Sequence, residues 1–192
     1  MNLPNKLTVL RILMIPVFIV ILAVPFHWGS FTVGEVTVLN THLIAMIIFA
    51  VASITDWLDG KIARARGLVT NFGKFADPLA DKMLVMTAFV MLVELGKAPA
   101  WIVAIIVCRE LAVTGLRLLL VEGGEVMAAA WPGKVKTATQ MLAIIFLLID
   151  NVPFNLIHIP VAQGLLYICL IATVYSGIDY FAKNTAVFKG SM

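Results

Sequence analysis

Apolar residues run along this chain in six long blocks separated by short polar connections. The blocks cover approximately residues 7–26, 41–63, 77–96, 99–121, 135–150 and 156–181. Pro25 to Asn40 is predicted to be one of the connections, because it contains Gly29, Ser30 and Gly34. A helix needs about 20 apolar residues to cross a bilayer. The pattern predicts an all-α integral membrane protein: a six-transmembrane-helix bundle forming a single domain over residues 1–192.

Composition removes the soluble alternatives. Apolar residues make up 61% of the 192 residues and charged residues 13%, whereas soluble domains carry roughly 25% charge. A small soluble globule could not bury that much apolar surface. The two cysteines, Cys108 and Cys169, lie inside apolar blocks, so we expect small buried side chains rather than a disulfide.

Basic residues orient the predicted bundle. They lie at the opening of the chain, at or near the second and fourth connections and in the tail: Lys6, Arg11, Lys61, Arg64, Arg66, Lys74, Arg117, Lys134, Lys136, Lys183 and Lys189. The remaining connections contain only Lys97. The positive-inside rule then places both termini in the cytoplasm. The net charge of +3 is explained by anionic lipid headgroups, without a nucleic-acid partner.

Aromatic rings and histidines fall at the predicted outer ends of the helices: His27, Trp28, His42, Trp101 and His158. Such amphipathic rings favour the membrane interface, and we prefer this placement to metal ligation for the three histidines. The first block resembles a signal peptide, but no small-residue cleavage site follows it, so we expect it to be retained.

Four aspartates crowd into one segment that apolar helices flank: Asp56, Asp59, Asp77 and Asp81. A carboxylate within a span costs about 3 kcal/mol on insertion scales, so such residues point inward and have partners. Asp56 and Asp59 share one side of the second helix, and Asp77 and Asp81 share one side of the third. A short connection makes the two helices antiparallel, so the four carboxylates are predicted to meet near the cytoplasmic face.

Divalent cations would relieve the repulsion between four such carboxylates. All-oxygen ligands select hard ions, Mg²⁺ or Mn²⁺. Gly60 allows a ligand to approach the backbone closely, and Lys61 and Arg64 supply positive charge, an arrangement typical of phosphoryl transfer. The alternative is that the acids form helix–helix ion pairs with nearby basic residues: Lys61, Arg64, Lys74 and Lys82.

The segment from Asp56 to Asp81 matches D-x2-D-G-x2-A-R-x8-G-x3-D-x3-D at all eight fixed positions. It resembles the signature of the CDP-alcohol phosphotransferase family. The opening residues 2–8 with Arg11, Arg109-Glu110 with Arg117, and residues 133–137 are similar to the bacterial members that use glycerol 3-phosphate as acceptor. The similarity therefore extends over nearly the whole chain.

The resemblance implies a homodimer in the cell membrane with its site open to the cytoplasm. It implies two divalent cations held by Asp56, Asp59, Asp77 and Asp81, with Asp81 also the general base. The acceptor hydroxyl would attack CDP-diacylglycerol and release CMP. Gly60, Ala63 and Arg64 would face the CDP group.

Three further residues have two interpretations each. Gly73 belongs to the signature, but it is equally explained as a loop or close-packing glycine. Asn5 and Thr8 are candidates for contacting the nucleotide, and helix capping is the alternative for both.

A second set of charges suggests the acceptor site. Arg109 lies near the middle of the fourth block, where an arginine must face a partner or a wet cavity. Arg117 follows two turns later, and Lys134 and Lys136 begin the fifth block. Together they predict a pocket for the phosphate of glycerol 3-phosphate. The alternatives are an ion pair of Arg109 with Glu110 and simple positive-inside flanking for the lysines. Asp179 is left unassigned.

The sequence thus predicts an enzyme that transfers a phosphatidyl group from CDP-diacylglycerol to glycerol 3-phosphate. The nearest alternative is the same chemistry with another alcohol: inositol phosphate, serine or phosphatidylglycerol. A divalent-cation transporter is more distant, because the acids lie near one face and no pair of broken helices occurs in matching halves.

Overall fold

The structure is a computed structural model that describes residues 2–65, 71–122 and 131–185. Within its helices, the side chains of residues 3–4, 56–65, 71–75, 78, 118, 121–122 and 131–132 are not described. Six long helices account for most of these residues: α1 (Leu3–Ala23), α2 (Asn40–Ala65), α3 (Asn71–Glu94), α4 (Ala100–Glu122), α5 (Trp131–Leu148) and α6 (Val161–Lys183).

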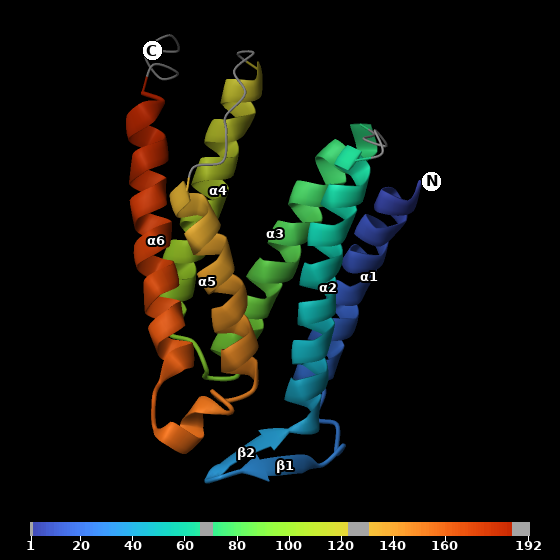
Figure 1. Cartoon of the computed structure of the whole chain (residues 1–192), viewed down its shortest axis with the longest axis vertical. Coiled ribbons are helices and arrows are strands. Elements are labelled where there is room, and N and C mark those ends of the chain that lie inside the picture. The colour runs from blue at the N-terminus through green and yellow to red at the C-terminus, as the bar shows by residue number, and fades with distance from the viewer. Residues whose placement is uncertain (1, 66–70, 123–130, 186–192) are drawn as a thin grey trace.

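The helices form an elongated bundle (Figure 1). α1 packs against α2 and α3, α5 packs against α6, and α4 also packs against α6. Contacts of α2 and α3 with α5 join these groups. α1 begins and α6 ends at the same end of the bundle, which we call the terminal end. α2 ends and α3 begins at the terminal end as well, and a small β-hairpin marks the opposite end.

The hairpin was not predicted from the sequence. β1 (Ser30–Val33) pairs antiparallel with β2 (Val36–Leu39), and Val33 lies opposite Val36. Gly34 opens the two-residue turn with a φ of 64°, a conformation that glycine adopts without strain. The connection predicted between the first two helices is therefore partly strand.

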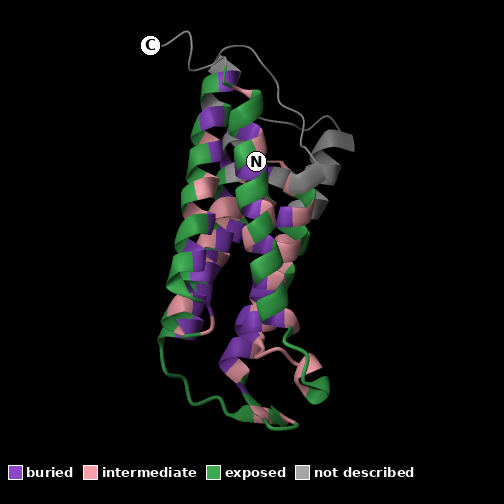
Figure 2. Cartoon of the chain, turned by 90° about the vertical axis from the view of Figure 1, so that its left-hand side faces the viewer, coloured by how far each residue is buried: buried purple, intermediate pink, exposed green. Residues whose placement is uncertain are grey.

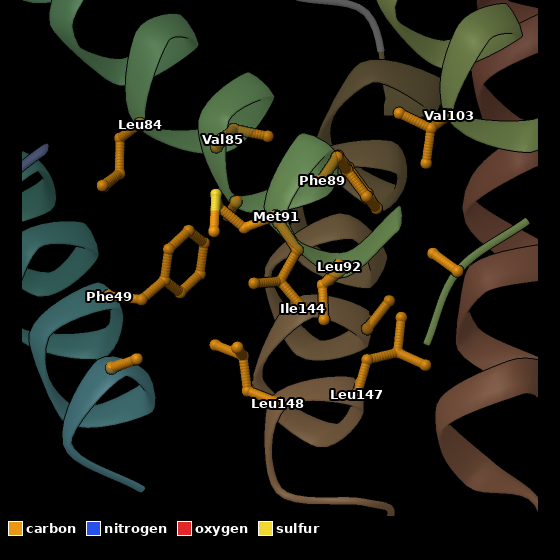
Figure 3. Close-up of a cluster of buried hydrophobic side chains, with 14 of the residues drawn as sticks. Phe49, Leu84, Val85, Phe89, Met91, Leu92, Val103, Ile144, Leu147 and Leu148 are labelled. Atoms are coloured by element: carbon orange, nitrogen blue, oxygen red, sulfur yellow. The ribbon is translucent and has the colours of Figure 1, made fainter. Parts of the chain in front are cut away.

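All six described helices contribute to the hydrophobic core, and Figure 3 shows its part around α2, α3 and α5. Phe49 of α2 points toward Leu84 and Met91 of α3, and Ile144 and Leu148 of α5 complete this part of the core. In a membrane, close van der Waals packing of such side chains, rather than their removal from water, holds the helices together. The core fixes the position of α3, the helix that carries Asp77 and Asp81.

Exposed residues run along the outer sides of the helices (Figure 2), and many of them are large aliphatic residues. Ile171 and Ile178 of α6 and Leu13 of α1 are all more than half exposed. Two helical stretches in the described residues, Asn5–Ala23 and Val161–Lys183, are long and apolar enough to cross a membrane. These observations indicate a membrane protein.

Observed helix bounds differ from the predicted blocks mainly at the N-termini. α1 begins at Leu3 rather than near residue 7, because the side chain of Asn2 accepts a hydrogen bond from the Asn5 backbone N–H and caps the helix. Capping by Asn5 or Thr8 is therefore wrong. α6 begins at Val161 rather than near residue 156, after a short 3₁₀ turn over Phe154–Ile157 and then Pro160.

Two predictions about single side chains also need correction. Gly73 lies inside α3, so its interpretation as a loop glycine is wrong. Cys169 is buried as predicted, but Cys108 is exposed; both are free thiols. Asp179, which had no predicted role, forms an ion pair with Lys183 one turn away on α6, with 2.8 Å between Oδ1 and Nζ.

A polar cluster holds the bundle together near the hairpin end. The Lys97 ammonium group donates to Asp150 Oδ2 at 2.8 Å, to the Leu148 carbonyl at 2.9 Å and to His42 Nδ1 at 2.9 Å. His42 lies in the first turn of α2 and is buried in this cluster, and its placement at the depth of the membrane interface stays a prediction. Burial lowers the pKa of Lys97, an effect that its bond to Asp150 only partly offsets.

The pKa of Asp150 is lowered as well. Burial acts to raise it, but interactions with the nearby His42 and with the Lys97 ammonium group outweigh that effect. The cluster therefore holds a carboxylate that stays ionised between the first turn of α2, the α3–α4 connection and the end of α5.

Candidate active site

The four aspartates lie at matching positions along α2 and α3. Asp59 is six residues before the end of α2, and Asp77 is six residues after the start of α3. At 1.5 Å per residue, each is about 9 Å from its helix end, and Asp56 and Asp81 are about 14–15 Å from theirs. Because both helix ends lie at the terminal end (Figure 1), the backbone places the four positions at similar depths.

Asp77 has a partner on α1. The hydroxyl of Thr8, which is fully buried, donates a hydrogen bond to Asp77 Oδ1. This bond fixes the orientation of the carboxylate. Thr8 therefore orients Asp77, a predicted metal ligand. The contact of Thr8 with the nucleotide stays a prediction.

A buried arginine lies one turn further along α1. Arg11 is completely buried, and its Nε donates to the carbonyl of Ala52 on α2 at 3.3 Å. Arg11 is thus an internal residue. Its inclusion in the positive-inside pattern implied instead a flanking charge at the membrane surface. Ala52 precedes Asp56 by one turn of α2, so α1 brings a fixed positive charge close to the acidic segment.

A cavity of about 700 Å³ lies between α3, α4, α5 and α6. Its charged lining residues are Asp81, Lys82, Arg109, Glu110, Arg117, Lys134 and Lys136. Five of these seven are cationic, so the described lining carries a formal excess of positive charge. All four residues predicted to bind the acceptor phosphate therefore share one cavity with Asp81.

Glu110 neutralises part of this charge. Its Oε1 accepts from Arg109 Nη1 at 2.8 Å and also pairs with Lys136 Nζ. The ion-pair alternative for Arg109 thus describes a real contact, although Arg109 still lines the cavity. Glu110 joins α4 to α5 through this bridge.

The other cations bond to neutral oxygens. Arg117 Nη2 donates to the phenolic oxygen of Tyr180 at 2.7 Å, and Lys82 donates to the hydroxyl of Thr114. Lys134 lines the cavity with an exposed side chain. Among the described contacts, Arg117 and Lys82 therefore keep their charge available to an anion.

Three cavity residues were missed as site residues by sequence reasoning. Lys82 was considered only as an ion-pair partner of the aspartates, Glu110 only as a partner of Arg109, and Tyr180 not at all. Lys82 follows Asp81 directly, and this position was the only sequence signal for it. Tyr180 had none, because it is 63 residues from the arginine that it contacts.

For most of the residues predicted to face the CDP group, the structure describes the backbone but not the side chain. Gly60, Ala63 and Arg64 lie in the last turns of α2 and Gly73 in the first turn of α3, but their side chains are not described. Asn5 is buried in the first turn of α1. The roles of these residues stay predictions.

The fit of the site to divalent cations rests on the donor chemistry of α3. Asp77 and Asp81 are partly buried, lie four residues apart on one helix and offer hard carboxylate oxygens. Across the described side chains, no three acidic, histidine or cysteine residues come together; the side chains of Asp56 and Asp59 are outside that set. Asp77 and Asp81, the two predicted ligands whose side chains are described, therefore have donor chemistry that fits a hard cation.

An apolar helical bundle with a basic cavity beside an acidic helix edge has the architecture of a membrane enzyme acting on phosphorylated substrates. Residues 1–175 match the family described as CDP-alcohol phosphatidyltransferase, and the chain belongs to that family. The resemblance inferred from the Asp56–Asp81 signature is confirmed.

Curated relatives align with nearly the full chain. The CDP-diacylglycerol–glycerol-3-phosphate 3-phosphatidyltransferase of Bacillus subtilis (strain 168) is 50% identical over 190 residues, which cover 99% of this chain and 98% of the relative. A probable phosphatidylglycerophosphate synthase of Mycobacterium tuberculosis (strain H37Rv) is 40% identical over 95% of this chain and 81% of the relative. A second CDP-diacylglycerol–glycerol-3-phosphate 3-phosphatidyltransferase, from Pseudomonas fluorescens, is 36% identical over 94% and 88%.

Proposed function

We propose that this protein transfers the phosphatidyl group of CDP-diacylglycerol to glycerol 3-phosphate, giving phosphatidylglycerophosphate and CMP. The acceptor hydroxyl oxygen forms a bond to the lipid-side phosphorus, and the bond from that phosphorus to the CMP oxygen breaks. The hydroxyl proton passes to the Asp81 carboxylate. The family and the relatives with this activity support the proposal.

The observation that carries the proposal is the shared cavity of Asp81 and the cations. Glycerol 3-phosphate brings a dianionic phosphate, and an acceptor without phosphate would not need the cavity's excess positive charge. Arg117, Lys82 and Lys134 supply charges that Glu110 does not already pair in the described contacts. A phosphate held there keeps the acceptor in the same cavity as Asp81.

Asp56, Asp59, Asp77 and Asp81 would hold divalent cations, two in number by the family resemblance and either Mg²⁺ or Mn²⁺. Such ions neutralise the phosphoryl oxygens and lower the pKa of the attacking hydroxyl. Thr8 orients Asp77 for that role, and Arg11 offsets the negative charge of the segment from within the bundle. Gly60, Ala63 and Arg64 would accommodate the CDP group, with Gly73, Asn5 and Thr8 nearby.

The placement in the membrane follows from the helices and the charges. Six helices over a single domain, with both termini and the cavity at the cytoplasmic face of the cell membrane, account for the basic residues of the terminal end. α4 is as long as α6, but it carries Arg109, Glu110 and Arg117, which face the cavity rather than lipid. A homodimer is the expected assembly and stays a prediction.

The test is an acceptor panel with the purified full chain in detergent. Protein, CDP-diacylglycerol and Mg²⁺ or Mn²⁺ are combined with glycerol 3-phosphate, inositol phosphate, serine or phosphatidylglycerol, and the CMP released is measured. We expect rapid, metal-dependent release with glycerol 3-phosphate alone. Equal release with another alcohol would assign that acceptor instead. No release with any alcohol, together with metal uptake into vesicles, would favour the cation transporter.

A further inference from the structure

One face of α6 contacts both arginines of the cavity. The guanidinium of Arg109 donates through Nη2 to the hydroxyl of Ser176 at 2.5 Å, and Ser176 in turn donates to the Thr173 carbonyl. One turn further, Tyr180 accepts from Arg117. Ser176 and Tyr180 are four residues apart and both are buried, so they lie on the same inward side of the helix.

Tyr180 also contacts the arginines through its ring. The guanidinium carbon of Arg117 is 5.2 Å from the ring centroid, and that of Arg109 is 6.0 Å. A cation over an aromatic face within about 6 Å is attracted to it. The ring itself is only 3% exposed and packs among Val113, Leu116 and Leu120 of α4, which leaves it little freedom to move.

Gly177 provides the space for Arg109. A Cβ at this position would lie 3.1 Å from Arg109 Cγ and 3.6 Å from Nε. The first distance is shorter than ordinary contact, so any larger residue would displace the arginine stem. The absence of a side chain thus lets Arg109 pass close to α6 on its way to Glu110 and the cavity.

We propose that Tyr180, Ser176 and Gly177 form a positioning face on α6 that aims Arg109 and Arg117 at the phosphate of the acceptor. The inference rests on the proposed function, since it assigns these residues to the acceptor site. Arginine side chains have many rotamers, and fixing two of them before the substrate binds removes an ordering cost from binding. None of the three residues belongs to the aspartate signature.

The first test is Tyr180→Phe, which keeps the ring and removes the hydroxyl. A hydrogen bond to a charged group is worth enough to change an affinity about tenfold. We expect the KM for glycerol 3-phosphate to rise about tenfold, with kcat within twofold and the KM for CDP-diacylglycerol unchanged. Tyr175→Phe is the matched control: the same substitution on the same helix, at a residue that is 62% exposed.

A double-mutant cycle shows whether Tyr180 acts through Arg117. In an Arg117→Ala background, which itself raises the acceptor KM, Tyr180→Phe should have no further effect on that KM. Additive effects would overturn the proposal. A Tyr180→Phe variant with a lower kcat and an unchanged acceptor KM would also overturn the proposal. A smaller folded fraction alone would produce that result.

The glycine is tested with a second matched pair on α6. Gly177→Ala should raise the acceptor KM severalfold by shifting Arg109, whereas Gly164→Ala should leave it unchanged, because a Cβ at Gly164 meets no described atom within 4 Å. Equal effects of the two variants would contradict the role of Gly177.

A binding measurement separates this inference from the proposed function. Inorganic phosphate should raise the Tm of the purified wild-type protein, and Tyr180→Phe should need about tenfold more phosphate for the same rise. If the wild type releases no CMP with glycerol 3-phosphate but shows this difference, the proposed function fails and the positioning face stands. If CMP is released but the two proteins respond to phosphate alike, the positioning face is wrong.

Discussion

At the scale of single side chains, two residues of α1 contact the acidic segment or the helix turn beside it. Thr8 donates to Asp77, and Arg11 lies fully buried against the Ala52 carbonyl, one turn before Asp56. Ligating carboxylates need such partners, because an unoriented carboxylate binds metal weakly. α1 therefore contributes to the site although it carries none of the signature aspartates.

Thr8→Val removes the hydroxyl and keeps the shape of the side chain. Loss of a partner of a metal ligand typically costs 10–100-fold in metal affinity. We expect the Mg²⁺ concentration for half-maximal CMP release to rise at least tenfold, and Thr8→Ser to restore it. If Thr8 instead contacts the nucleotide, Thr8→Val will raise the KM for CDP-diacylglycerol and leave the Mg²⁺ requirement unchanged.

Asp77→Asn tests the carboxylate itself. The substitution keeps the volume and an oxygen that can accept from Thr8, so the bundle should fold with a Tm close to that of the wild type. Mutating a residue that only supports a metal ligand costs up to about a hundredfold in activity. Loss of the ligand's own charge should therefore lower CMP release by at least about a hundredfold. Normal turnover in a folded Asp77→Asn protein would refute the metal-ligand role.

At the scale of elements, the sequence predicts the helices well and their contacts poorly. Blocks of about 20 apolar residues located all six helices, because an apolar run of that length is far longer than an ordinary strand. The hairpin over 30–39 was missed because Gly29 and Gly34 were weighed above the alternation from Thr32 to Val38, which is typical of strands. Glycine spacing marks the turn but not the strands beside it.

The same limit applies to the site. Spacing within one helix predicts that Asp77 and Asp81 share a face, because neighbours three or four residues apart do so. It cannot tell which faces of different helices meet. The contacts of Lys82 with Thr114 and of Arg117 with Tyr180 therefore required the three-dimensional structure.

The bridge through Glu110 gives a prediction for the packing of α4 against α5. Glu110→Gln leaves Arg109 and Lys136 without their shared counter-charge in a buried place, and breaking a buried pair costs about 3–5 kcal/mol. For a chain of this size the Tm should fall by about 10 °C. The measurement is thermal unfolding of the purified protein in detergent.

Asp179→Asn is the control for that substitution. It makes the same carboxylate-to-amide change in the ion pair with Lys183, whose side chain is 67% exposed. Exposed pairs contribute little because water screens them, so the Tm should hardly move. Similar losses in Glu110→Gln and Asp179→Asn would show that burial of the bridge is unimportant.

At the scale of the whole molecule, charge is concentrated at two depths with an apolar core between them. Near the terminal end, α3 to α6 surround the basic cavity beside Asp77 and Asp81. Near the hairpin end, His42, Lys97 and Asp150 tie three segments together. Along α3 and α5, core residues such as Phe89 and Ile144 (Figure 3) lie between the residues of the two sites, so a change in one site should leave the other intact.

That separation predicts that Asp150 contributes to stability in a pH-dependent way without affecting catalysis at neutral pH. The lowered pKa of Asp150 means that its ionised form is favoured by folding. This stabilisation is complete at neutral pH and is lost as the pH falls below about 4, through the lowered pKa. Asp150→Asn should therefore lower the Tm at pH 7 by a few degrees, which corresponds to about 1 kcal/mol after allowance for its partial exposure.

The difference in Tm between the wild type and Asp150→Asn should then shrink as the pH is lowered from about 4 toward about 2. Asparagine tolerates the left-handed backbone of this position, where φ is 54°, so the substitution removes the charge without adding strain. Glu35→Gln, in the exposed turn of the hairpin, serves as the control and should match the wild type at every pH. A Tm difference that stays constant across this range would mean that Asp150 contributes through packing rather than charge.

An unchanged KM for glycerol 3-phosphate in Asp150→Asn at neutral pH would show that the cavity does not depend on the hairpin end.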